Sequence, residues 1–192
     1  MRVTGKRWVW MVSLCVGVLV GGGVGFAEQP SEPISPEAQD AIRRLESADL
    51  YLQQMAFMQL EALREPATAA AVRRYLDSPK AETRAFSVRA LAAIEGTAAI
   101  PVLIERLKQD RSPLVRLAAL LALEPLQDPT VMPMLMTMLR DRNPEVRMAA
   151  VDVVSRIAQP QAREAIRLRW RREQNRDVRR VLEDAMKRIE GS

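Results

Sequence analysis

Apolar residues recur along this chain at helical spacing, three and four positions apart, in segments that resemble one another. The richest segment, residues 143–157 (NPEVRMAAVDVVSRI), has counterparts 31 residues earlier, at 112–123, and 32 residues later, at 175–182, with a looser copy at 81–91. No segment alternates apolar and polar residues over a useful length, so we predict no strands. A fixed period of this size predicts stacked helical units, each of which buries its apolar face against its neighbours.

Each unit is expected to contain two helices. A Ser-Pro or Asn-Pro pair caps the first helix in three units, and glycine or proline ends it. The second helices are expected at 100–107, 132–139 and 162–170. Alanines in the first helices are small enough for these helices to pack closely against those of the next unit. The pattern therefore predicts an all-α fold, a right-handed solenoid of stacked antiparallel helix pairs with one continuous core.

The first residues have a different character. Residues 1–27 combine a basic start, an apolar run and the ending Gly25-Phe26-Ala27, which is typical of a cleaved signal peptide. We therefore expect a periplasmic or secreted protein with no membrane span after cleavage. Residues 28–35 are polar and rich in proline, which predicts a disordered leader.

The remaining chain, residues 36–192, is expected to form a single solenoid. Its last helix has a polar outer face, as a terminal capping unit requires. The expected parts are a degenerate N-terminal cap at 36–78, three fuller repeats at 79–173 and a C-terminal capping helix at 174–192.

Composition narrows the chemistry. The chain has 29 basic and 24 acidic residues, but the predicted signal peptide holds three of the basic ones, so the mature part carries 26 − 24 = +2. So small a net charge gives little support to a nucleic-acid partner, and we expect none. The mature part has no histidine and no cysteine, since Cys15 lies in the signal peptide. Disulfides, thiolate or imidazole metal sites and Ser-His-Asp catalysis are therefore excluded.

Carboxylates are the catalytic groups that remain. Asp152 and Asp184 each stand four residues before an arginine, Arg156 and Arg188, which is the spacing of surface ion pairs on a helix. Nothing in the sequence singles out two carboxylates that converge across a cleft. We therefore expect no enzyme, no catalytic residue, no metal and no cofactor.

The repeated motif can be compared with a known family. Pro-x-Val-Arg-x-Ala-Ala, then Ala-Leu, a turn and Ile-Pro-x-Leu, recurs every 31 to 32 residues. This pattern resembles HEAT repeats, most of all the short bacterial variety similar to phycobilisome-lyase-like repeats. The resemblance covers residues 79–189 well and 49–76 poorly. It implies the solenoid fold but says little about function, because such solenoids hold proteins, peptides, chromophores or DNA.

One arginine recurs at the same place in each first helix. It could form a basic binding stripe, or it could tie its helix to loop carbonyls or to Asp110 and Asp141 just upstream. We favour the structural role, because a planar guanidinium suits a tight contact between repeats. This structural ladder comprises Arg84, Arg116, Arg147 and Arg179.

The second helices offer a candidate binding surface. Their alignment places Met132, Leu135, Met136 and Leu139 in the core. One position outside this core stripe in each second helix, with the position one turn before it, makes a row on the face that HEAT-like solenoids turn to the concave side. An apolar centre between guanidinium groups is typical of a protein contact. The predicted partner-binding residues are Val102, Arg106, Met134, Met138 and Arg169.

Our leading hypothesis is a non-catalytic exported scaffold that binds a protein partner of unknown identity through this second-helix face. Met134 and Met138 could instead be incidental packing, or a Cu(I) thioether site. The metal role is the least favoured, because two thioethers without histidine or cysteine make a poor site.

The C-terminal part is rich in arginine. Residues 163–192 carry 10 − 6 = +4, whereas residues 28–162 carry 16 − 18 = −2. Arg163, Arg167 and Arg171 share one helix face, which is either an anion patch or a solvated surface. Two alternative functions stay open. They are a lyase-like or ligand-carrying HEAT protein, and a binder of an anionic polymer or nucleic acid through this helix.

Overall fold

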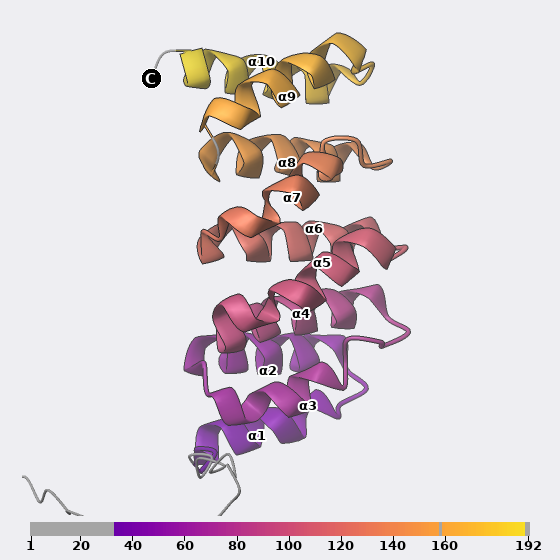
Figure 1. Ribbon diagram of the computed structural model, residues 1–192. Helices are drawn as coiled ribbons and strands as arrows, with labels where there is room; N and C mark the ends of the chain where they lie inside the picture. Colours follow the sequence, from indigo (N-terminus) through magenta and orange to yellow (C-terminus); the bar gives the residue numbers. More distant parts are fainter. Residues whose placement is uncertain (1–32, 158, 191–192) are drawn as a thin grey trace, which may run out of the picture. The chain divides into compact units, whose positions relative to one another are not determined.

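The computed structural model describes residues 33–157 and 159–190, so the predicted signal peptide and most of the predicted leader lie outside the described residues. The described part contains helices and no strand, in agreement with the predicted all-α solenoid (Figure 1). The α-helices are α1 (Pro36–Leu45), α2 (Leu50–Leu63), α3 (Ala69–Arg73), α4 (Ala81–Glu95), α5 (Ile100–Gln109), α6 (Pro113–Leu123), α7 (Met132–Met138), α8 (Pro144–Ile157), α9 (Gln159–Arg172) and α10 (Arg176–Glu190). Short 3-10 turns are η1 (Pro66–Thr68), η2 (Gly96–Ala99), η3 (Glu124–Leu126) and η4 (Pro129–Val131).

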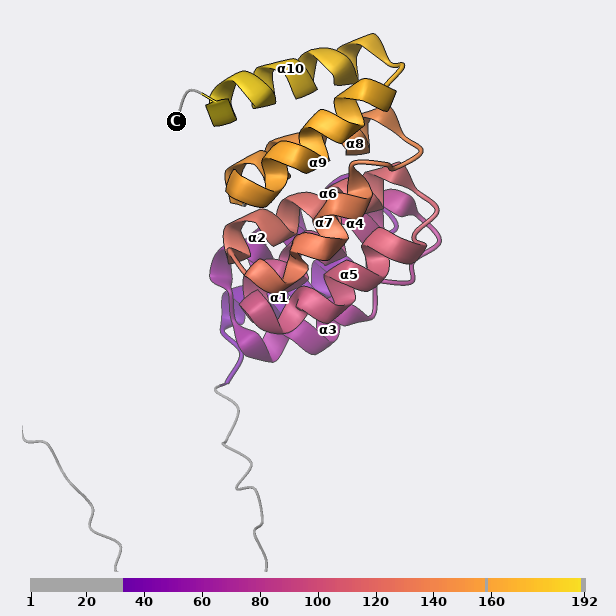
Figure 2. The same ribbon diagram turned by 45° about the horizontal axis from the view of Figure 1, so that its top comes forward.

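The helices form two layers (Figures 1 and 2). The first helices, α2, α4, α6, α8 and α10, pack side by side in a row. Each second helix, α3, α5, α7 and α9, packs most extensively on the first helix of the following unit rather than on its own. Because every unit is tied in this way to the next, the units share one continuous core.

Alanines bring the first helices together. Ala90, Ala119 and Ala150 are fully buried at the row of first helices. The gaps between layers are filled by leucines such as Leu91 and Leu120, also fully buried. Burying one such leucine stabilises the fold by about 1.5–3 kcal/mol relative to leaving it exposed.

The helix starts follow the sequence only in part. Asn143 caps α8, since its Oδ1 accepts hydrogen bonds from the backbone N–H groups of Glu145 (2.8 Å) and Val146 (3.1 Å). The serines expected to do the same do not. Helix α4 begins two residues after Pro79, at Ala81, and the Ser112 side chain makes no capping hydrogen bond to α6.

Gly96 separates α4 from α5. The stretch Ala81–Gln109 is long and apolar enough to cross a membrane by length and composition. Gly96 follows the last residue of α4 and begins η2. Its φ is +57°, a conformation that favours glycine. The stretch is thus two successive helices, and apolar side chains from both, such as Leu91 and Leu103, lie in the core.

The turn that ends α7 corrects the predicted helix phase. We expected Met136 in the core and Met138 on the exposed face, but Met138 is only 7% exposed and Met136 is partly exposed. Helix α7 ends at Met138, and the chain tightens there, since the N–H groups of Arg140 and Asp141 bond the carbonyls three residues back, both at 3.0 Å. Met138 follows the buried Leu135 by three residues and so borders the same helix face, and it packs in the core where the chain tightens into this 3-10 turn.

Candidate functional site

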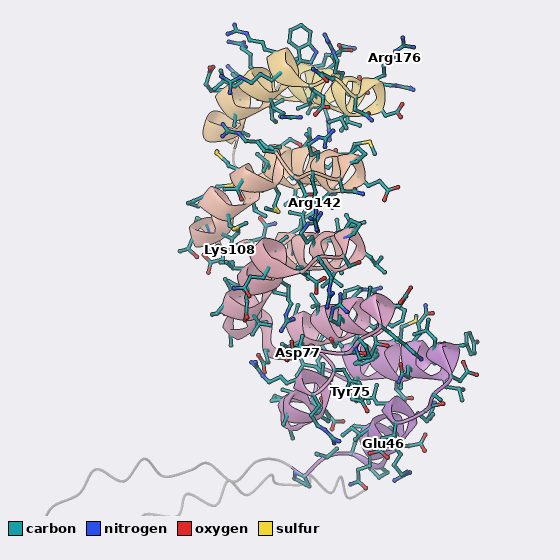
Figure 3. All side chains as sticks on the ribbon, turned by 90° about the vertical axis from the view of Figure 1, so that its right-hand side faces the viewer. Glu46, Tyr75, Asp77, Lys108, Arg142 and Arg176 are labelled. Carbon is teal, nitrogen blue, oxygen red and sulfur yellow. The ribbon has the colours of Figure 1, made fainter. Side chains whose placement is uncertain are left out.

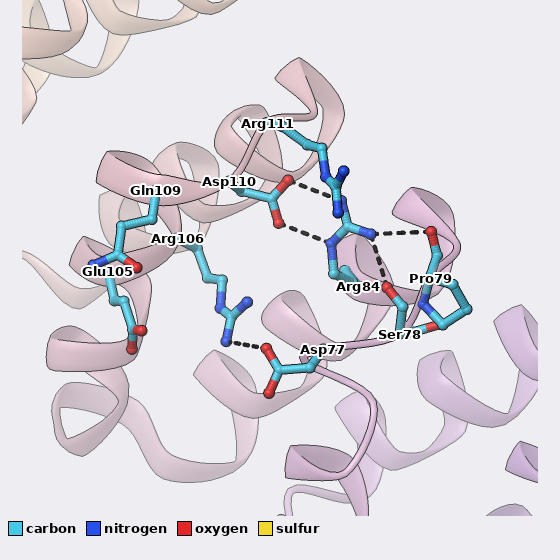
Figure 4. Close-up of a pocket in the computed structure, with 9 residues that line it drawn as sticks. All are labelled: Asp77, Ser78, Pro79, Arg84, Glu105, Arg106, Gln109, Asp110 and Arg111. Atoms are coloured by element: carbon cyan, nitrogen blue, oxygen red, sulfur yellow. Dashed lines mark hydrogen bonds and ion pairs between the residues drawn. The ribbon is translucent and has the colours of Figure 1, made fainter.

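The edge of the solenoid where one unit connects to the next is organised by the arginine ladder. Arg84, near the start of α4, meets the Asp110 carboxylate side-on: Nε lies 2.8 Å from Oδ2 and Nη2 2.9 Å from Oδ1 (Figure 4). Its Nη1 donates to the carbonyls of Ser78 (2.8 Å) and Pro79 (3.3 Å). One guanidinium therefore joins the loop before α4 to the loop after α5.

The next two rungs repeat this geometry. Arg116 meets Asp141 with both distances at 2.7 Å, and Arg147 meets Glu173 at 2.9 and 3.0 Å. The Nη1 group of each also donates to the carbonyl six residues upstream, that of Asp110 at 3.0 Å and that of Asp141 at 2.8 Å. We expected these aspartates to pair with the arginine that follows them. Instead, each gives its carboxylate to the preceding unit and its carbonyl to the following one.

The first and last positions depart from the pattern. Arg179 lies over the ring of Trp170, 4.9 Å from the centroid, where a cation–π contact replaces the carboxylate. At the other end, Gln53 takes the place of a charged rung. Its Nε2 donates to the carbonyls of Leu45 (3.0 Å) and Ser47 (2.8 Å), and its Oε1 accepts from the Thr83 hydroxyl at 2.9 Å. Sequence analysis missed Gln53, because a glutamine carries no motif.

The ladder carboxylates are held in the ionised form. Burial raises the pKa of Glu173, but hydrogen bonds from Arg147, the Asn175 backbone and Arg169 outweigh it and lower the pKa to about 2. Burial also raises the pKa values of Asp110 and Asp141. Hydrogen bonds from Arg84 to Asp110 and from Arg116 to Asp141 lower them, and the net result is that both pKa values are lowered. All three carboxylates are thus neutralised internally and add no net negative charge to this edge.

Cations flank every ladder carboxylate. Lys108 and Arg111 stand beside Asp110, Arg140 and Arg142 beside Asp141, and Arg172 and Arg176 near Glu173. Figure 3 looks onto this edge, where the labelled Lys108, Arg142 and Arg176 come from three successive units. Because the ladder arginines neutralise the ladder carboxylates, the flanking cations leave this edge basic from α5 to α10. The acidic neighbours there are Glu105, Glu145, Glu164 and Asp177, and the exposed Asp77 lies at the α4 end of the edge.

The second-helix face holds a recess of about 520 Å³ between α7 and α9. Its floor is apolar, with Met136, Leu139, Ala165 and Leu168, and Leu168 is 42% exposed. Its rim is charged, with Arg140, Glu164, Arg169 and Arg172. An apolar floor inside a ring of mostly positive side chains can accept an apolar group that carries a negative charge beside it.

Comparison with known proteins adds to this geometry. A family model described as HEAT repeats matches residues 38–124 and 100–187, more than half of the chain. The chain belongs to the HEAT-repeat family. No curated protein matches its sequence. Among solved structures it is similar to the complex of CpcE and CpcF of phycocyanin lyase from Nostoc sp. PCC7120, with 23% identity, a TM-score of 0.61 and coverage of 77% of this chain and 96% of that one.

That likeness bears on the expectation that the chain is not an enzyme. A solved HEAT-like structure of this fold is a complex that carries the name of a lyase. The expectation of no enzyme is therefore wrong. The lack of histidine and cysteine does not exclude catalysis, because the same fold occurs in a lyase complex. In residues 33–157 and 159–190 there is no group of three or more acidic, histidine or cysteine side chains that could hold a metal ion.

The predicted partner-binding residues do not form an exposed row on these HEAT repeats. Val102 and Met134 are partly buried against the core, and Met138 is buried. Arg106 and Arg169 keep only 16% and 19% of their side chains exposed, and both are ion-paired, Arg106 with Asp77 and Arg169 with Glu173. Of the five, only Arg169 lines the α7–α9 recess.

The predicted anion patch lies outside this recess. Arg163 donates to the Ile189 carbonyl at 2.8 Å, so it serves the C-terminal end of α10. Arg167 also has an interaction partner, and Arg171 is exposed at the end of α9. The cations at the recess include Arg140 and Arg172 instead. They belong to different repeats, and the only hint in the sequence is that each stands beside a ladder carboxylate.

Proposed function

We propose that this HEAT-repeat protein binds a protein partner through its second-helix face, and that the α7–α9 recess receives an acidic segment bearing an apolar side chain. The observation that carries the proposal is the pairing of an apolar floor with a guanidinium rim. Leu168 leaves a large part of its side chain exposed at that floor. Desolvating it on binding would contribute favourably, and interface centres are enriched in such apolar and arginine contacts.

The rim is arranged for charge recognition. Arg169 is held by Glu173 and forms a fixed wall. Arg140 and Arg172 are exposed, and no ion pair joins either of them to another side chain in the described part of the chain. Together with the cations of the loop edge they favour an acidic partner and speed its approach at low salt.

We further propose that binding takes place outside the cytoplasm, where the protein acts as a scaffold. This rests on the signal-peptide pattern of residues 1–27 alone. An acidic exported protein is therefore the partner class that we infer.

Paired substitutions of two equally exposed leucines test the recess. Leu168 is 42% exposed in the recess, and Leu114 is 43% exposed on the first helix α6. A partner is captured by cross-linking in cells, identified by mass spectrometry and purified, and its Kd for each variant is measured. We expect Leu168→Glu to weaken binding by about tenfold or more, because it places a carboxylate where an acidic segment binds. Leu114→Glu should leave the Kd unchanged, and wild-type affinity in both variants contradicts the recess as the site.

A second candidate function is a lyase-like role as one subunit of an assembly. The observation that favours it is the similarity to the two-subunit phycocyanin lyase complex. Incubation of the purified protein with phycocyanin, followed by absorbance and mass spectrometry of the phycocyanin, tests this candidate. The incubation is repeated with the partner captured by cross-linking, and a phycocyanin with unchanged spectrum and mass in both cases contradicts it.

A further inference from the structure

Arg106, on α5, uses only half of its hydrogen-bonding edge (Figure 4). Its Nη2 donates to Asp77 Oδ1 at 2.9 Å. Its Nε lies on the same edge, is buried and has no hydrogen-bond partner in the described part of the chain. A buried donor without a partner is unfavourable, because it has lost water without gaining an acceptor.

The same structure shows how this edge is used elsewhere. Arg84, in the same recess, gives its Nε and Nη2 together to one carboxylate, that of Asp110. In the next unit the place of Arg106 is taken by Met138, so the ladder does not need an arginine there. Arg106 is thus a second guanidinium in this recess, with an incomplete side-on contact.

Asp77 is a weak partner for it. The Asp77 side chain is 85% exposed and offers a single oxygen, and an ion pair to so exposed a carboxylate contributes little because water competes for it. Asp110 cannot take its place, because both of its oxygens are bonded to Arg84. The contact between Arg106 and Asp77 can therefore be displaced by a carboxylate that reaches both donors.

We propose that this recess is a carboxylate-binding site, in which the ligand displaces Asp77 and takes Nε and Nη2 of Arg106 side-on. The recess measures about 270 Å³, and Gln109 and Arg111 add further donors to its lining, with Glu105 as an opposing charge. It accepts the carboxylate of an aspartate or glutamate side chain or that of a small free acid. The site is distinct from the α7–α9 recess and does not depend on the partner proposed for it.

The Arg106 Nε–H group provides a direct readout by NMR of the uniformly ¹⁵N-labelled protein. The probes are sodium malonate and a capped peptide containing adjacent aspartates, with sodium chloride at equal ionic strength as the control. We expect a saturable shift of this resonance with a carboxylate probe and none with chloride. A shift with malonate identifies a free acid as a sufficient ligand, and a shift with the peptide alone identifies a protein side chain.

Two substitutions should change the affinity for the carboxylate probe in opposite directions. Arg106→Met introduces the residue that the next unit carries at the same place. Because this variant lacks the Arg106 Nε–H group, its binding is followed at the side-chain amide of Gln109, which lines the same recess. We expect the carboxylate-induced shift of that amide to be lost while the protein stays folded, as followed by circular dichroism. Asp77→Asn removes the internal competitor and should tighten binding about two- to fivefold. The proposal is overturned if neither probe gives a saturable shift, if chloride shifts the resonance equally, or if Asp77→Asn leaves the affinity unchanged.

Discussion

Arg147, near the start of α8, and Glu173, just after α9, meet side-on, with Nε to Oε2 at 2.9 Å and Nη2 to Oε1 at 3.0 Å, and both are buried. The contact joins α8 to the loop that precedes α10. Glu173 also accepts hydrogen bonds from the N–H groups of Gln174 (3.1 Å) and Asn175 (2.9 Å) and from Arg169. A buried carboxylate is tolerated here because almost every lone pair has a donor.

Removing this guanidinium should destabilise the fold. We expect Arg147→Ala to lower the free energy of unfolding by about 2–4 kcal/mol, because it leaves Glu173 and the Asp141 carbonyl short of donors. Arg156 on the same helix is the control, since its side chain is 56% exposed and pairs with Glu124. Arg156→Ala should cost less than about 1 kcal/mol. Urea unfolding measures both, and equal losses would contradict a special role for the ladder.

The ladder should also make stability depend on pH. The pKa of Glu173 is lowered from 4.5 to about 2 in the folded protein, so its contribution is fully present above pH 4.5 and is lost as the pH falls towards 2. That difference corresponds to about 3 kcal/mol. Thermal unfolding between pH 6 and pH 2.5 should show a steeper loss for the wild type than for Glu173→Gln. Parallel curves would mean that Glu173 titrates normally.

The buried Met138 predicts a large effect of charge. Met138→Glu should destabilise the protein by about 3 kcal/mol or more, because the carboxylate would lie in the core without a partner. Thr137→Glu, one residue away on the exposed side of α7, should change stability by less than about 0.5 kcal/mol. Comparison of the two melting temperatures checks this, and a stable Met138→Glu protein would restore the helix phase expected from the sequence.

Export can be tested at the N-terminus. Expressed in a bacterium with its full sequence, the protein should be recovered from the periplasm or medium with Glu28 as its first residue. N-terminal sequencing and intact mass give the answer. Retention of Met1 on a cytosolic protein would contradict the predicted signal peptide.

The sequence by itself determined the architecture. Apolar residues at helical spacing, repeated every 31 to 32 positions, specify amphipathic helix pairs that can bury their faces only by stacking. The ladder arginines could be found in the same way, because each stands at a fixed place in that repeat. These features are local or periodic, so they can be read without knowing how the units meet.

The pairing of charges was decided by the tertiary structure. Asp152 and Arg156 were expected to pair within α8, yet Asp152 bonds Arg188 of α10 at 2.9 Å and Arg156 bonds Glu124 of the preceding unit. Long side chains on stacked helices reach a neighbouring unit as easily as the next turn of their own helix. Spacing along one helix therefore cannot settle which acid an arginine meets.

The candidate binding sites depended on the tertiary structure for the same reason. The α7–α9 recess joins side chains from two repeats, among them Met136, Arg140 and Leu168, and Met136 reaches it because Met138, not Met136, is buried in the core. The edge of Arg106 is left half-used beside Asp110, whose two oxygens are bonded to Arg84 of α4. A repeat pattern specifies which residues are equivalent, but contacts between units determine which donors and acceptors are left for a ligand.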